Sequence, residues 1–345
     1  MKKLIYSLIL AASTLTAFAS QNSKQDFIHH EFDVNRNMTF EIVNQYGNIT
    51  ITNNNSDRLI IDATITITSR HDVDKKLNSI NINLSRKEQK IMAITDIDFK
   101  ALKNDEFNIE YNISAPSYIN INISNKYGNV VAENLLGSTN IKVSYGMLKV
   151  NKIQDMSGGF PELTLKYSRN CTIDEMLVGG ISISYSDINI NRAKALAISS
   201  KYSDLHINNT TSMAVESAYD KYTIGNVEKA DFTSKFTNLN ISTLSTSSDI
   251  NMSYGNVDIE NLGNNFDNIN IKTSYANVGI GVKNLSKAYK IDLNTSYGNI
   301  KYPKMDQQSI YNNPNSERVE GQKGSADKMP QIKVSTKYGN IRLSD

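Results

Sequence analysis

The sequence has no tryptophan, one cysteine, five prolines and 17 glycines in 345 residues. A collagen needs far more glycine, a proline-rich linker far more proline, and a disulfide scaffold more than one cysteine. The chain instead contains 18 tyrosines and is rich in isoleucine and asparagine. Isoleucine and tyrosine favour strands while asparagine favours turns, so the composition predicts a folded, β-rich protein.

Residues 1–19 have the pattern of a cleaved secretory signal peptide. Lys2 and Lys3 precede an apolar run at 4–11, and Ala17-Phe18-Ala19 fits a cleavage site. No later apolar stretch approaches the ~20 residues of a membrane span, so we expect no transmembrane segment in the mature chain. Without Lys2 and Lys3, the 37 basic and 35 acidic residues become 35 of each. This balance argues against nucleic acid as a partner.

A short phrase, Tyr-Gly-Asn followed by isoleucine or valine, recurs five times, at Tyr46, Tyr127, Tyr254, Tyr297 and Tyr338. Looser copies fill the gaps between them, and their aromatic residues are Tyr145, Tyr167, Tyr185, Tyr202, Tyr219, Phe236 and Tyr275. From Tyr127 to Tyr297 the aromatic recurs every 17–22 residues, and the last interval is 41 residues. Such a period is typical of stacked repeats.

Each repeat has apolar residues at alternate positions before and after the aromatic, which predicts two strands joined by a tight corner. We expect the Gly-Asn pair to supply the positive φ of that corner. The fold class predicted is all-β, a parallel β-solenoid with coils of 17–22 residues. An antiparallel meander with Tyr-Gly-Asn hairpins is the alternative, although it would not keep one strand phase at a nearly constant period.

Three regions are predicted after the signal peptide. Residues 20–120 read as an irregular β-rich N-terminal cap with one short helix within 72–80, because Val73, Leu77 and Ile80 share a helical face. Residues 121–345 hold the repeats, with a mobile insertion at about 303–330 that contains Pro303, Pro314 and Pro330. The sequence ends within a repeat, and an open strand edge there would allow edge-mediated self-association.

The alternating N-terminal strands, the short charged helix, the break at Ser114-Ala115-Pro116-Ser117 and the Tyr-Gly-Asn repeats resemble the bacterial putative-adhesin family of unknown function. They are also similar to the head domains of putative auto-transporter adhesins. The resemblance covers about residues 30–345. It implies an exported β-solenoid with an adhesive role, and it transfers no catalytic residue.

Two columns of stacked side chains are the candidate sites, because equivalent residues of successive coils lie about 4.8 Å apart. The first is an aromatic ladder, which we interpret as a structural corner stack; an exposed platform for glycan stacking is the alternative. Its tyrosines are Tyr46, Tyr127, Tyr145, Tyr167, Tyr185, Tyr202, Tyr254, Tyr275, Tyr297 and Tyr338. The second is a surface column two residues after the aromatic, with Arg169, Asp187, Asp204 and Lys221.

Asp187 and Asp204 could form an acid/base pair, but the flanking cations favour a charge-compensated ladder. The scattered histidines and Cys171 do not have metal-ligand spacing, and we recognise no cofactor or catalytic motif, so no enzyme, metal or cofactor is predicted. We therefore expect a non-enzymatic protein of the periplasm or cell surface that presents a polar ladder to an envelope glycan or protein. A periplasmic structural or sensing partner and a β-helical polysaccharide-acting enzyme are the alternatives.

Overall fold

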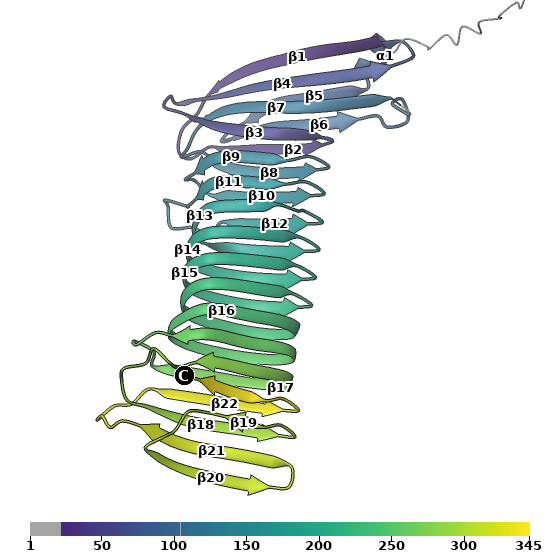
Figure 1. The fold of residues 1–345 in the computed structure, drawn as a ribbon. Coiled ribbons are helices and arrows are strands. Elements are labelled where there is room, and N and C mark those ends of the chain that lie inside the picture. The colour runs from purple at the N-terminus through teal and green to yellow at the C-terminus, as the bar shows by residue number, and fades with distance from the viewer. Residues whose placement is uncertain (1–21, 104) are drawn as a thin grey trace, which may run out of the picture.

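The computed structural model describes residues 22–103 and 105–345, so the predicted signal peptide lies outside the described residues. The fold is all-β, with 23 strands in one large mixed sheet. The only helix of the described part is α1 (Val73–Leu77). No helix in that part is long and apolar enough to cross a membrane. Figure 1 shows the strands stacked as rungs along one axis.

Each repeat contributes one strand to each of two opposed faces of the stack (Figure 1). The short strands of the first repeats are β2 (Thr39–Gln45), β3 (Gly47–Asn54), β8 (Asn120–Lys126), β9 (Val130–Leu135), β10 (Thr139–Ser144), β11 (Leu148–Ile153) and β12 (Glu162–Lys166). The longer strands that follow run through the returns between rungs and are β13 (Cys171–Ser184), β14 (Asp187–Lys201), β15 (Asp204–Ala218), β16 (Lys221–Leu262) and β17 (Asn268–Gly281).

Neighbouring repeats pair in parallel and in register. In the β14–β15 pair, Asp187 lies opposite Asp204, and Lys201 lies opposite Ala218. The residues that face each other are therefore equivalent positions of successive repeats, which is why the aromatic recurs at a nearly constant interval. The antiparallel meander considered above does not describe these repeats, because their strands are not paired as hairpins.

The core lies between the two faces and is filled by the alternating apolar positions of both strands. Ile181, Ile198 and Val215, four residues before the aromatic, are at most 4% exposed, as are Ile188 and Leu205, three residues after it. Burying a side chain of this size contributes about 1.5–3 kcal/mol. The stack is therefore held by a continuous apolar column as well as by its backbone ladder.

The N-terminal region is β-rich and less regular, as expected. Its strands are β1 (Asn22–Asp33), β4 (Arg58–Ser69), β5 (Ile80–Lys87), β6 (Lys90–Ile97) and β7 (Glu106–Pro116). The β1–β4, β4–β7 and β5–β6 pairs are antiparallel, whereas β6 and β7 join the repeats through parallel pairing with β2 and β3. The predicted helix is confirmed, and the Asp72 side chain caps it by accepting from the backbone N–H of Asp74 and Lys75.

The last repeat does not follow its predecessor in space, which corrects the order assumed from the sequence. Its strands are β22 (Gln331–Lys337) and β23 (Ile341–Ser344), while the preceding repeat contains β18 (Tyr289–Ser296) and β19 (Ile300–Lys301). β22 is paired in parallel with β17 on one side and with β18 on the other. The final rung is thus inserted between the two rungs that precede it in the chain.

The segment predicted as an insertion at about 303–330 forms the hairpin β20 (Gln307–Asn313) and β21 (Ser316–Lys323). β21 pairs antiparallel with β18 and covers the edge that the stack would otherwise present. The expectation of an open edge at the last repeat is therefore wrong, because both sides of that repeat are occupied. The outermost strand at this end is β20, whose residues are exposed.

Two of the corner glycines, Gly128 and Gly339, serve a purpose other than the one predicted. Gly128 does not have a positive φ. A Cβ atom placed on it would lie 1.8 Å from the backbone carbonyl oxygen of Gly47 in the neighbouring rung. Gly339 is in the same situation, 2.0 Å from the carbonyl oxygen of Ala276. Glycine is needed at these corners because the backbones of adjacent rungs approach closely.

We expect Gly128→Ala to lower the free energy of unfolding by about 1–3 kcal/mol, the usual cost of forcing extra volume into a packed site. Chemical denaturation monitored by circular dichroism would measure this. Ala276→Gly is the matched control, because alanine already fits that corner; it should cost less than about 1 kcal/mol. Equal effects of the two substitutions would contradict the close-approach explanation.

Candidate functional site

The aromatic residue of each repeat adopts the left-handed backbone conformation. Its φ lies between 52° at Tyr167 and 63° at Tyr219 in all of the repeats. This conformation turns the ring away from the core, although strand alternation alone would have pointed it inward. The aromatic residue itself therefore supplies the positive φ of the corner in every repeat, and among the corner glycines Gly255 alone also has a positive φ, of 150°.

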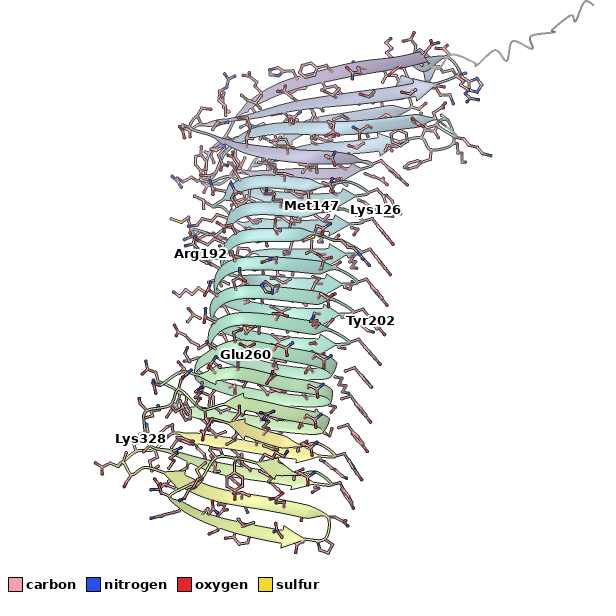
Figure 2. The ribbon with its side chains drawn as sticks, viewed as in Figure 1. Lys126, Met147, Arg192, Tyr202, Glu260 and Lys328 are labelled. Carbon is pink, nitrogen blue, oxygen red and sulfur yellow. The ribbon has the colours of Figure 1, made fainter. Side chains whose placement is uncertain are left out.

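The rings of successive corners stack on one another along one edge of the molecule. Centroids of neighbouring rings are 4.7–5.0 Å apart and their planes differ by 3–28°. We call this column the aromatic ridge. Figure 2 shows it along the edge of the molecule where its member Tyr202 is labelled. Its members in spatial order are Tyr46, Tyr127, Tyr145, Tyr167, Tyr185, Tyr202, Tyr219, Phe236, Tyr254, Tyr275, Tyr338 and Tyr297.

The ridge rings are 38–55% exposed, with Tyr46 and Tyr127 the least and Tyr297 the most exposed. Because each interior ring is stacked on both sides, its faces contact other rings, and its edge and hydroxyl group face solvent. A sugar that stacks on an aromatic needs a free ring face. The geometry therefore favours the corner stack over a stacking platform, and it leaves a continuous line of ring edges and hydroxyl groups.

At Tyr202, we expect Tyr202→Ala to be less stable than Tyr202→Gly by about 1 kcal/mol. Both substitutions remove the same ring, but only glycine adopts φ near +52° without a Cβ penalty. Thermal or chemical denaturation of the two variants would measure the difference. Ser199, an exposed strand residue of the same rung, is the control position, and there alanine should be the more stable replacement. The same ranking at both positions would contradict the assigned corner conformation.

Polar columns flank the ridge on both sides. The residue before each aromatic is often lysine, and Lys126, Lys201 and Lys337 place their ammonium groups 4.7, 5.2 and 5.3 Å from the centroid of the adjacent tyrosine ring. On the other side, asparagines two residues after the aromatic are hydrogen-bonded between rungs. Asn277 Oδ1, for example, accepts from Asn340 Nδ2 at 3.2 Å. The ridge and these columns form one long polar and aromatic edge.

The predicted charged column lies on the asparagine side of the ridge. Asp187 faces Asp204 across one strand pair, and Asp204 faces Lys221 across the next. Arg169, Asp187 and Asp204 line a hollow of about 340 Å³ together with ridge tyrosines. Asp187 Oδ1 accepts from the backbone N–H of Asn170 at 2.7 Å. None of the ion pairs within residues 22–103 and 105–345 joins the four predicted side chains, so charge compensation there does not involve direct contact.

A buried polar cluster beneath the ridge was not predicted. Asp220 is 5% exposed, and its carboxylate accepts four hydrogen bonds. The donors are the hydroxyl groups of Ser200 and Ser217, both at 2.7 Å, and the backbone N–H groups of Ser203 at 2.7 Å and Ala218 at 3.0 Å. The hydroxyl group of Tyr222 lies 2.6 Å from Ser200 Oγ. The cluster joins the rungs of Tyr202 and Tyr219 at the corner.

Burial raises the pKa of Asp220 above its ordinary value of 3.8, against the opposing effect of its hydrogen bonds. Burial also raises the pKa of Tyr222. The sequence does carry a signal for this cluster. Asp220 stands where other repeats have Gly128, Ser186 or Ser203, and Tyr222 stands in a column of aliphatic residues. Asp220 lines neither of the two hollows beside the ridge, and its four hydrogen bonds hold the corner together, so we assign it a structural role.

Cys171 is buried, and burial raises the pKa of its thiol to about 11, which disfavours the reactive thiolate. Among the residues that the structure describes, no group of three or more histidine, cysteine, aspartate or glutamate side chains could hold a metal ion.

Comparisons with known proteins identify no family. No protein-family model and no curated protein matches the sequence. Among solved structures, a putative cell adhesion protein from Clostridium sporogenes shares 9% identity over 94% of this chain and 99% of its own, with a TM-score of 0.18. A putative adhesin from Bacteroides fragilis shares 11% identity over 92% of this chain and 97% of its own, with a TM-score of 0.20. Neither likeness is close enough to carry an argument about this chain.

Proposed function

We propose that this chain is an exported, non-enzymatic β-solenoid whose aromatic ridge and flanking polar columns bind a glycan or a protein at the cell envelope. The observation that carries the proposal is the length and regularity of the exposed ridge. A stack of rings held by the backbone presents a ring edge at every rung and a hydroxyl group at every rung except that of Phe236, and the lysine and asparagine columns add hydrogen-bond donors beside them. Such an edge suits an extended partner with a repeating structure.

A pull-down from envelope fractions of the producing cells tests this proposal. The bait is the full chain, and the test variant carries Tyr167→Asn, Tyr185→Asn and Tyr202→Asn. Asparagine tolerates the left-handed conformation, so the corners should persist without their rings. The matched control replaces the same three residues by phenylalanine, which Phe236 shows is compatible with the stack.

We expect the asparagine variant to lose the captured glycan or protein and the phenylalanine variant to retain most of it. Equal capture by all three proteins would refute the ridge as the binding surface. Fractionation of the same cells separates the proposed locations, because retention inside the outer membrane would favour a periplasmic structural or sensing role. Turnover of an envelope glycan that Asp187→Asn and Asp204→Asn abolish would replace the binding proposal by an enzymatic one.

A further inference from the structure

The column immediately before the ridge alternates between lysine and small residues once the rungs are placed in spatial order. We call it the lysine column. From the second rung on, its members are Lys126, Ser144, Lys166, Ser184, Lys201, Ala218, Lys235, Ser253, Ser274, Lys337 and Ser296. Over seven successive rungs, lysine therefore occupies every second rung, at Lys126, Lys166, Lys201 and Lys235. The insertion of the last rung places Lys337 in the same line, three rungs beyond Lys235.

These lysines are free to meet a ligand. All five are exposed. No ion pair in the described part of the chain involves any of them, whereas Lys76 and Lys152 elsewhere are paired with carboxylates. The ammonium groups of Lys126 and Lys201 pack beside the ridge rings. This packing holds the two side chains along one line and limits their motion into solvent.

The charges near the column leave this line positive. The column itself contains no acidic residue among its described members. The acidic neighbour nearest in sequence on the same face, Glu216, is two residues before Ala218, at a rung that lacks a lysine. Three further carboxylates line the same hollow as Glu216 and stand four residues before a member of the column: Glu162, Asp231 and Asp249. Asp187 and Asp204 lie beyond the ridge, on its asparagine side. A ligand along the lysine column thus meets cations and hydroxyl groups first, while the carboxylates of the same face stand two or more residues further from the ridge and Asp187 and Asp204 lie beyond it.

The spacing of the lysines selects among polyanions. Every second rung corresponds to a separation of about 10 Å, twice the spacing of adjacent strands. Phosphates of a nucleic acid strand follow one another at about 3.4 Å along the helix axis, which gives roughly three charges for each lysine. An extended polysaccharide with a carboxylate on every second sugar places its charges about one disaccharide apart, close to the lysine spacing. The intervening serines can then hydrogen-bond to the uncharged sugars.

We propose that the lysine column and the aromatic ridge bind a linear acidic polysaccharide that carries one carboxylate per disaccharide and lies parallel to the stack. This inference rests on the proposed function and names its ligand class. The carboxylates pair with alternate lysines, while the hydroxyl groups of the ridge and the serines contact the sugars between them. The interior rings do not stack on sugars, because their faces are covered.

Binding of the full chain to hyaluronan, in which glucuronate alternates with an uncharged sugar, tests the inference by biolayer interferometry at two salt concentrations. The test variant carries Lys166→Gln, Lys201→Gln and Lys235→Gln. The control carries Lys194→Gln, Lys229→Gln and Lys283→Gln, which removes the same charge from exposed lysines in the returns between rungs. A second probe is carboxyl-reduced hyaluronan, which has the same chain without its charges.

We expect salt-sensitive binding that the test variant weakens about tenfold or more, the combined effect of three exposed ion pairs, and that the control changes less than about twofold. Carboxyl-reduced hyaluronan should bind as weakly to the native chain as hyaluronan binds to the test variant. Equal weakening by the two variants, equal binding of the two probes or no binding to hyaluronan would overturn the inference. The proposed function would still stand if the tyrosine-to-asparagine variant lost a different envelope partner in the pull-down.

Discussion

Val334→Asp is expected to lower the free energy of unfolding by more than about 4 kcal/mol, because it buries an uncompensated carboxylate in the core. Val334 is fully buried in β22, and its register partners are Ile271 of β17 and Leu293 of β18. The residues near a chain end usually tolerate such changes because they fray. Here the last rung lies inside the stack, so the damage should extend to β18 and to the hairpin that pairs with it. Denaturant unfolding of the full chain measures the loss.

Ile310→Asp is the matched control for Val334→Asp. Ile310 belongs to the outermost strand β20 and is 49% exposed, so its replacement should change the free energy of unfolding by less than about 0.5 kcal/mol. If the last repeat were a peripheral rung, as its place in the sequence suggests, Val334→Asp would be mild. A mild effect of Val334→Asp would therefore contradict the inserted position of the final rung.

Asp220→Ala is the second substitution with a large expected effect, about 3–5 kcal/mol of destabilisation. The change removes the acceptor for two serine hydroxyl groups and two backbone N–H groups, and a buried polar group left without a partner costs about 1–3 kcal/mol. Asp220→Ser should cost less, because serine stands at the equivalent corner in Ser186 and Ser203. Asp204→Ala, at an exposed position of the neighbouring rung, should have little effect. Similar losses for Asp204→Ala and Asp220→Ala would contradict the assigned role of the buried cluster.

The pH dependence of stability gives an independent test of Asp220. Its pKa is raised in the folded state, so its contribution to stability is fully present below the unfolded pKa of about 3.8 and is lost as the pH rises through the folded pKa. As the pH rises from the unfolded to the folded pKa of Asp220, the native chain should therefore lose stability relative to Asp220→Asn. Chemical denaturation at several pH values measures it. A difference that is independent of pH would show that the pKa of Asp220 is not raised.

The recurring aromatic phrase predicted the paired strands because its interval equals the register offset between rungs. The conformation of the corner could not be predicted with the same certainty. Glycine usually marks a positive φ, whereas here the backbones of Tyr127 and Tyr145 adopt it and their rings stack. Gly128 is required instead by the close approach of the neighbouring backbone. Stacking between residues far apart in sequence, such as Tyr46 and Tyr127, depends on the parallel pairing of β2 and β8. A single sequence does not report that pairing.

The candidate site was predictable in its members and less so in its geometry. The tyrosines and the charged column were identified because their positions repeat. The order of Tyr275, Tyr338 and Tyr297 was not, because sequence order is the natural expectation for stacked repeats and nothing in the repeat itself signals an insertion. This order matters for function, because it places Lys337 between Ser274 and Ser296 in the lysine column.

The most direct test of parallel, stacked corners with an inserted last rung is a pair of distance measurements by pulsed electron spin resonance. Spin labels are placed at Ser199 and Ser335 in one protein and at Ser199 and Asn294 in another, all equivalent positions three residues before the aromatic. The stack predicts about 24 Å for Ser199 to Ser335, five strand spacings, and about 29 Å for Ser199 to Asn294, six spacings. A shorter distance to Asn294 than to Ser335, or distances unrelated to the number of rungs, would contradict this architecture and the binding edge built on it.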